Sequence, residues 1–191
     1  YYNQILYVPS IGYNLYDGLT LGLKVDNRSM LNKPIVFGIS PTYATTTGSI
    51  IGSVYGAVDQ NIREPGQLYN IRYAMSASMS HYAPDASYTS LNPTVTFRFR
   101  DPNLRYNKNE YIQLKQLYIH REKTNFNIDK NTENYNVFNA KYGNFQSEAT
   151  KYYSFSTDLQ VANSFGKIAT EIRYRKIFDD NRQISLRFYT N

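Results

Sequence analysis

The chain has 191 residues, 41% of them hydrophobic, and it contains no cysteine. No segment approaches the 18 or more consecutive apolar residues of a membrane helix, which excludes a helical membrane protein. The absence of cysteine excludes disulfides, thiol nucleophiles and thiolate metal sites. A net charge of +6 suggests a nucleic-acid partner, but the lysines and arginines are scattered rather than clustered. We therefore expect no nucleic-acid binding.

Period-two alternation begins in residues 11–26, where Leu19, Leu21, Leu23 and Val25 alternate with polar or small residues. Asp17-Gly18 is either a turn or a bulge in one longer strand. A second strand follows Pro34, and Pro41 is a poor residue for its interior because proline cannot donate a ladder hydrogen bond. Thr45 to Gly48 indicates a tight turn, and residues 49–58 return as a strand of small residues.

Residues 68–81 form the clearest strand, and the rest of the chain is organised around it. One side carries Tyr69, Ile71, Tyr73, Met75, Ala77 and Met79, whereas the other carries Asn70, Arg72, Ala74, Ser76, Ser78 and Ser80. At about 3.3 Å per residue this strand is roughly 40 Å long, whereas strands of soluble proteins usually have about 5–6 residues. A tilted strand that crosses a bilayer needs about 9–11 residues.

The second half of the chain repeats the pattern. Alternation predicts further strands over residues 92–100, 110–121, 134–145, 152–162, 166–176 and 183–190. Residues 123–133 are the most polar stretch and the longest expected loop. No helical period is present. These signals predict one all-β domain over residues 1–191, with about ten strands and a range of 8–12.

Two all-β architectures fit this alternation. In a soluble sandwich the polar face meets water, whereas in a membrane barrel it lines the lumen and the apolar face meets lipid. Long alternation and charges that stay in phase with the polar face favour an antiparallel up-and-down transmembrane β-barrel. The 20 tyrosines and 10 phenylalanines also suit a membrane interface, where aromatic residues form girdles. Candidate girdle residues near strand ends are Tyr82, Tyr111, Tyr174 and Phe188.

The first third of the chain resembles a known family. The run GYNLYDGLTLGLKVDN, followed by NKPIVFGISPTYATTTGSIIGSVYG, is similar to the start of the C-terminal outer-membrane β-barrel region of M1-type (gluzincin) metallopeptidase-related proteins of the Bacteroidetes. The matching positions are Tyr13, Tyr16, Asp17 and Gly18, then Pro41 and Tyr43. The resemblance implies a zinc peptidase-like domain upstream of Tyr1. The His-Glu-x-x-His signature is absent from this chain, so no catalytic residue is carried over.

The sequence contains little that indicates chemistry. His81 and His120 are the only histidines, and neither has a partner at metal-ligand spacing. We interpret His81, in phase with Met79 at a strand end, as an interfacial histidine. No serine lies in a Gly-x-Ser-x-Gly elbow and no phosphate-binding glycine loop is present. We therefore predict no catalytic, cofactor-binding or metal-binding residue and no cofactor, and whether the complete protein is an enzyme stays open.

Charged residues on the polar face of the late strands are the most notable group: Asp158, Lys167, Glu171, Arg173, Arg175 and Arg187. Inside a narrow barrel they have to pair, since unpaired buried charge is costly. They form either a solute path or, as we favour for so narrow a barrel, a salt-bridged interior.

The sequence as a whole predicts a barrel of the bacterial outer membrane that anchors an upstream domain or a protein assembly. The chain opens on Tyr1 without a signal peptide, so we expect that either a leader has been removed or the chain is a segment of a longer polypeptide. Expected partners are outer-membrane lipid and lipopolysaccharide, with other outer-membrane or periplasmic proteins as further candidates. Two alternatives stay open. One is a small-solute outer-membrane channel, and the other is a soluble sandwich that binds glycans through exposed tyrosines.

Overall fold

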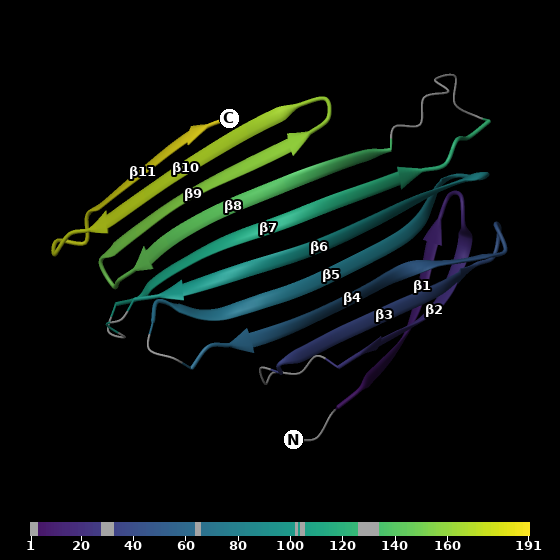
Figure 1. Cartoon of the computed structure of the whole chain (residues 1–191), viewed down its shortest axis with the longest axis horizontal. Coiled ribbons are helices and arrows are strands. Elements are labelled where there is room, and N and C mark those ends of the chain that lie inside the picture. The colour runs from purple at the N-terminus through teal and green to yellow at the C-terminus, as the bar shows by residue number, and fades with distance from the viewer. Residues whose placement is uncertain (1–3, 28–32, 64–65, 102, 104–105, 126–133) are drawn as a thin grey trace. The chain divides into compact units, whose positions relative to one another are not determined.

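The computed structural model of the chain describes residues 4–27, 33–63, 66–101, 103, 106–125 and 134–191. The described residues form eleven strands and no helix: β1 (Leu6–Asn14), β2 (Gly18–Asp26), β3 (Ile35–Ala44), β4 (Ser49–Asn61), β5 (Leu68–Ala83), β6 (Ala86–Arg100), β7 (Lys108–Arg121), β8 (Tyr135–Ser147), β9 (Lys151–Ala162), β10 (Gly166–Ile177) and β11 (Gln183–Thr190). They make one antiparallel sheet in chain order (Figure 1). The all-β prediction is confirmed, and eleven strands lie within the predicted range. A separate search of these residues finds no helix long and apolar enough to cross a membrane.

The predicted strand bounds agree best after residue 150. β9 and β10 differ from the prediction by one residue each, and β11 has the predicted bounds. Residues 11–26 form two strands rather than one, so the Asp17-Gly18 signal is a turn. β6 begins at Ala86 rather than Asn92. The expected loops after Asn27, before Leu68 and after Lys123 lie partly outside the described residues.

Contacts divide the chain into two compact units. Unit 1 comprises Tyr1–Asp59, Tyr73–Pro93 and Gln116–Asn136, and unit 2 comprises Gln60–Arg72, Thr94–Lys115 and Val137–Asn191. β4, β5, β6, β7 and β8 contribute residues to both units. The prediction of a single domain over residues 1–191 stays a prediction.

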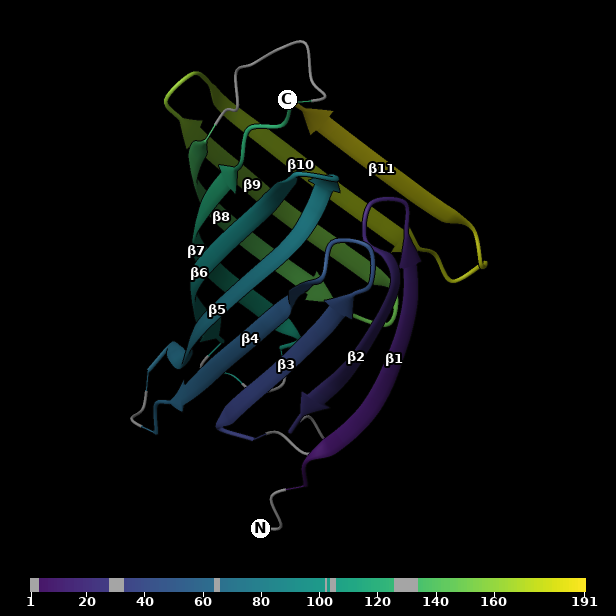
Figure 2. The same ribbon diagram turned by 90° about the vertical axis from the view of Figure 1, so that its right-hand side faces the viewer.

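In unit 1 the first four strands lie side by side (Figure 2) and share one apolar and one polar face. Ile11, Leu21, Tyr43 and Ile50 are opposite one another across β1 to β4 and are exposed on the apolar face. One residue further along each strand, the polar face carries Gly12, Thr20, Ala44 and Ser49, of which Thr20 and Ala44 are buried.

In unit 2 the β9–β10 pair shows the same two faces without interruption. Tyr153↔Tyr174, Phe155↔Ile172 and Leu159↔Ile168 are opposite one another on the apolar face. Leu159 and Ile168 keep 39% and 60% of their surface exposed. The alternate positions carry the polar pairs Ser154↔Arg173, Ser156↔Glu171 and Gln160↔Lys167.

Burial in the described residues is inverted relative to a water-soluble protein, in which large apolar side chains are the most often buried. The buried hydrophobic residues are mostly alanines: Ala44, Ala57, Ala83, Ala86, Ile119 and Val137. The buried polar residues are more numerous: Asp17, Thr20, Asp26, Asn27, Asn70, Ser87, Ser90 and Thr96. The large aliphatic and aromatic side chains are mainly exposed, whereas the buried side chains are mostly small or polar.

Pro41 corrects one prediction, because it lies inside β3, which pairs with β2 and β4. Two glycines accommodate it. A Cβ atom on Gly22 would lie 2.6 Å from the Pro41 carbonyl oxygen, and one on Gly52, the partner of Pro41, would lie 2.0 Å from the Ser40 carbonyl oxygen. Gly52 has a φ of 142°, which side-chain-bearing residues rarely adopt. β3 therefore tolerates Pro41, which has no N–H to donate to the ladder, at a place where the backbones of β2 and β4 lie close to it.

Tyr111 corrects a second prediction. A Cβ atom on Gly143 would lie 2.5 Å from the Tyr111 ring, so the ring packs directly on this glycine. Gly143 is opposite Ser156 and therefore lies on the polar face. The Tyr111 ring covers the polar face of unit 2 and does not belong to an apolar-face girdle.

Candidate functional site

The most enclosed polar side chain of the described residues, Asp17, lies in the turn between β1 and β2. The turn begins where the Tyr16 amide donates to Asn14 Oδ1 at 3.3 Å, and it ends at Gly18, whose φ is 69°. A Cβ atom on Gly18 would lie 2.1 Å from Thr46 Oγ1, so glycine is required there both for its φ and for the close approach of the β3–β4 turn. The Thr46 amide donates to the Asp17 carbonyl at 3.0 Å and joins the two turns.

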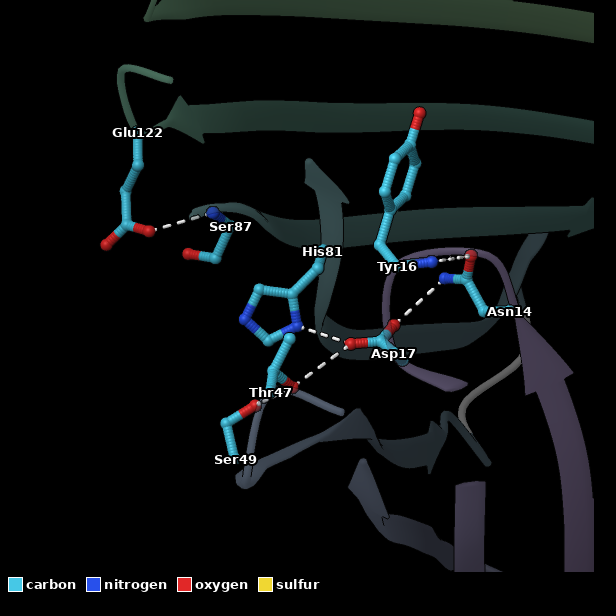
Figure 3. Close-up of polar contacts among 8 residues, drawn as sticks. All are labelled: Asn14, Tyr16, Asp17, Thr47, Ser49, His81, Ser87 and Glu122. Carbon is cyan, nitrogen blue, oxygen red and sulfur yellow. Dashed lines mark hydrogen bonds and ion pairs between the residues drawn. The ribbon is translucent and has the colours of Figure 1, made fainter. Parts of the chain in front are cut away.

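The Asp17 carboxylate is fully buried and accepts hydrogen bonds from three elements (Figure 3). Asn14 Nδ2 donates to Oδ2 at 2.9 Å, and His81 Nδ1 lies 2.6 Å from Oδ1. Since a carboxylate only accepts, His81 carries the proton on Nδ1. Thr47 Oγ1 lies 3.5 Å from Oδ1 and 2.9 Å from Ser49 Oγ. We call Asn14, Asp17, Thr47, Ser49 and His81 the Asp17 cluster.

His81 reaches Asp17 because β5 contains one extra residue. Ser78 Oγ and Ser90 Oγ are 2.8 Å apart and therefore share a face, yet the two-residue connection after Ala83 puts Ala83 opposite Ala86. β5 therefore has one more residue than β6 between these points, the arrangement of a β-bulge. Met79 and Ser80 are both exposed, as expected where alternation is interrupted.

The interpretation of His81 as an interfacial residue in phase with Met79 is therefore wrong. After the bulge, His81 lies on the polar face, and its side chain is only 11% exposed. The sequence holds one signal for this geometry. Pro84-Asp85 is a two-residue turn, which fixes the register of the hairpin end independently of the register at Ser78.

Two carboxylates outside the strands join the β5–β6 hairpin to the segment that follows β7. Glu122 accepts from the Ser87 amide at 2.8 Å, and Asp85 accepts from the Thr124 hydroxyl at 2.5 Å and the Asn125 amide at 2.9 Å. The Ser87 amide holds the pKa of Glu122 below its usual value, with smaller contributions from the charges of His120 and His81. The Asn125 amide and the Thr124 hydroxyl likewise lower the pKa of Asp85.

The Asp17 cluster contains a carboxylate–imidazole pair, which in hydrolases orients a general base. Catalysis by such a pair also needs a nucleophile bonded to the second imidazole nitrogen. In the described part of the chain His81 is hydrogen-bonded through Nδ1 alone, and the nearby Thr47 and Ser49 hydroxyls lie on the Asp17 side. The described residues also hold no group of three or more His, Cys, Asp and Glu side chains suited to a metal ion. What the arrangement does is tie two turns to β5.

Only three of the six late-strand charged residues interact with one another, whereas the sequence predicted a single group of six. Glu171 accepts from Arg173 Nε at 2.9 Å and from Arg187 Nε at 2.6 Å, so these three residues are brought together. Asp158 instead accepts from Asn139 Nδ2 at 2.6 Å. The Arg175 guanidinium lies over the Tyr152 ring at 5.8 Å, and Lys167 is exposed. Only Glu171, Arg173 and Arg187 (the Glu171 network) of the six predicted residues pair with one another in the described chain, and a salt-bridged barrel interior stays a prediction.

Comparisons with known proteins gave no match to any family model, any curated protein or any solved structure.

Proposed function

We propose that this chain is the membrane-embedded β-barrel of a bacterial outer-membrane protein, and that it serves as an anchor or scaffold for an attached domain or assembly. The observation that carries the proposal is the inverted burial of the two faces. A sheet whose exposed face is aliphatic and aromatic and whose buried groups are polar matches a transmembrane barrel, in which the apolar face meets lipid.

The order of the cross-strand residue pairs along β9 and β10 also supports this proposal. Its apolar face begins with Lys151↔Lys176, continues with Tyr153↔Tyr174 and Phe155↔Ile172, and ends with Val161↔Gly166. From Tyr153 to Val161 the strand rises about 26 Å, or roughly 20 Å at a tilt of about 40°. This span is close to the apolar band of outer-membrane barrels, about 25 Å. The order of charge, aromatic ring and aliphatic chain is that of a membrane cross-section.

Two threonine hydroxyls in the centre of the same face also support the proposal. Thr157 and Thr170 are opposite each other, and their Oγ1 atoms are 3.3 Å apart. A polar group in hydrocarbon is costly unless it is hydrogen-bonded. The two threonines satisfy each other, so this face can meet lipid without unpaired side-chain polar groups in its centre.

An anchoring role is favoured over catalysis because the enclosed polar groups hold strands and turns together. Asp17 accepts from Asn14 and His81, and Glu171 accepts from two arginines. The resemblance to metallopeptidase-related proteins of the Bacteroidetes would make the anchored part a zinc peptidase-like domain. Sequencing the gene upstream of the Tyr1 codon tests this part separately.

A vesicle experiment tests membrane insertion. The protein is refolded into phosphatidylcholine vesicles, floated on a density gradient, washed with carbonate and examined for heat-dependent mobility by gel electrophoresis. We expect it to float, to resist extraction and to migrate faster before boiling. Recovery in the aqueous fraction as a folded monomer would overturn the proposal.

A small-solute channel is the second candidate, because the polar face carries several charged side chains in unit 2, among them Lys167, Arg173 and Arg187. Planar-bilayer recordings distinguish the two functions, since an anchor gives no steady open steps. A glycan-binding sandwich is less well supported, because a sandwich packs two sheets and the described strands form a single sheet.

A further inference from the structure

Two lysines lie directly opposite each other at one end of the apolar face of unit 2. Lys151 of β9 pairs in register with Lys176 of β10. The next two layers of the same face are Tyr153↔Tyr174 and Phe155↔Ile172. The two ammonium groups therefore lie beyond the aromatic layer, at the end of the face that we propose meets lipid. We call Lys151 and Lys176 the lysine pair.

The lysine pair has no counterion within the described residues. Like charges directly opposite each other destabilise a strand pair. Neither ammonium has a carboxylate within 4.0 Å among the described side chains. Glu148 is opposite Lys151 across the β8–β9 turn, where its amide donates to the Lys151 carbonyl at 2.8 Å, but its carboxylate accepts from the neutral Gln146 amide and lies beyond ion-pair distance of both lysines. Asp180 pairs with Arg182. Lys176 Nζ lies 4.8 Å from the centre of the Phe178 ring, and Lys151 is exposed.

On the polar face of the same unit, two cations that are opposite each other do have a counterion. Arg173 and Arg187 are also directly opposite each other, on β10 and β11. Glu171 lies between them and accepts from both guanidinium groups, which offsets part of their repulsion. An internal counterion is therefore present where the sheet carries paired cations on the polar face, and it is absent at the lysine pair. At the lysine pair, an anion that does not belong to the described chain can take the place of the missing counterion.

We propose that the lysine pair binds the phosphate group of a membrane lipid. The inference rests on the proposed membrane function, because lipid phosphates lie at the level reached by side chains just beyond an aromatic girdle. One phosphate accepts from both ammonium groups and removes their repulsion. The rings of Tyr153 and Tyr174 then contact the upper part of the acyl chains, where amphipathic rings are stable.

The test compares lipid preference in two matched double variants. K151Q/K176Q removes the lysine pair, whereas K123Q/K167Q removes two other exposed lysines that lie outside the apolar face. Each protein is inserted into phosphatidylcholine vesicles with spin-labelled phosphatidic acid or spin-labelled phosphatidylcholine. Electron paramagnetic resonance then gives the ratio of the two labelled lipids at the protein surface. Inorganic phosphate is titrated in a parallel sample.

We expect the wild type and K123Q/K167Q to prefer phosphatidic acid and K151Q/K176Q to lose that preference, by about fivefold for each lysine removed. An equal loss in both variants would show a general effect of charge and overturn the site, as would an absence of preference in the wild type. Displacement of the labelled lipid by inorganic phosphate would assign the pair to a soluble anion and overturn the lipid assignment. Failure of the wild type to float with the vesicles would instead overturn the proposed membrane function.

Discussion

The β9–β10 pair and the Asp17 cluster show two ways in which a polar residue comes to lie on the polar face of this sheet. In β9–β10 every residue keeps the face that its parity gives it, from Lys151↔Lys176 to Val161↔Gly166. In the Asp17 cluster a turn residue and a residue after a β-bulge meet on the polar side. In the regular ladder, the odd or even position of a residue along its strand therefore determines which face it lies on. Where turns meet the sheet, tertiary contacts determine the face.

Removal of the Asp17 carboxylate should have the largest effect. Asp17→Ala deletes the acceptor of Asn14, Thr47 and His81 in a buried site, so we expect the free energy of unfolding to fall by about 4 kcal/mol. Urea unfolding of the vesicle-inserted protein measures it. Asp180→Ala is the control, since its ion pair with Arg182 is exposed and worth less than about 1 kcal/mol. Equal effects of the two substitutions would contradict the role of Asp17.

A charge on the apolar face of the regular ladder should have the second largest effect. Leu159→Arg is expected to cost about 3 kcal/mol in a bilayer, because the guanidinium would lie in hydrocarbon. Ser156→Arg introduces the same side chain on the polar face opposite Glu171, and there we expect a change below about 1 kcal/mol. The same urea titration compares them. If Ser156→Arg proved the more damaging, the two faces would have been assigned the wrong way round.

Substitution of Gly52, which is opposite Pro41, should have the third largest effect on stability. Gly52→Ala adds a methyl group 2.0 Å from the Ser40 carbonyl oxygen at a φ of 142°, and we expect a loss of about 2 kcal/mol. Gly56 of the same strand has nothing within 4 Å of an added Cβ atom, so Gly56→Ala should be nearly neutral. Unchanged stability of Gly52→Ala would show that β3 does not need glycine beside its proline.

The smallest effect concerns pH at the segment after β7. The pKa of Asp85 is lowered by the Asn125 amide and the Thr124 hydroxyl. A lowered pKa in the folded state means that this contribution to stability is complete above the usual carboxyl pKa of about 4 and is lost as the pH falls through the folded value. Hydrogen exchange of the Asn125 amide, corrected for intrinsic rates, should show protection at pH 6 that is lost only at a pH below the range in which an ordinary aspartate titrates. Asp85→Asn should remove this pH dependence, and persistence of it would exclude Asp85 as the cause.

The regular half of the fold could be predicted from sequence because alternation alone determines it. The sequence predicts the strands at 152–162, 166–176 and 183–190 within one residue, whereas it leaves Asp17-Gly18 open between a turn and a bulge. Pro41 was misjudged, because the glycines that accommodate it, Gly22 and Gly52, come from neighbouring strands. The small residues of β4 do not by themselves show which glycine is needed, since Gly52 lies against the β3 backbone and Gly56 has open space.

Little of the Asp17 cluster could be predicted from the sequence. Asp17 was noted as a turn residue, and its burial arises from contacts with Thr47 and His81, which are distant along the chain. His81 was assigned by continuing the phase of Met79 through a bulge that no single residue marks. The Glu171 network was foreseen only as part of a larger group, because which charges pair depends on register across β9, β10 and β11.

The most direct test of the lipid-facing sheet is a cysteine scan along β9, for which the cysteine-free chain gives a clean background. Single cysteines at positions 154–161 carry a fluorescent probe in vesicle-inserted protein, and quenching by a nitroxide in the acyl chains is compared with quenching by iodide in water. We predict that probes at Phe155, Thr157, Leu159 and Val161 are quenched from the lipid and that those at the alternate positions are not. Lipid quenching at Ser154, Ser156 and Gln160, or at no position, would contradict the account.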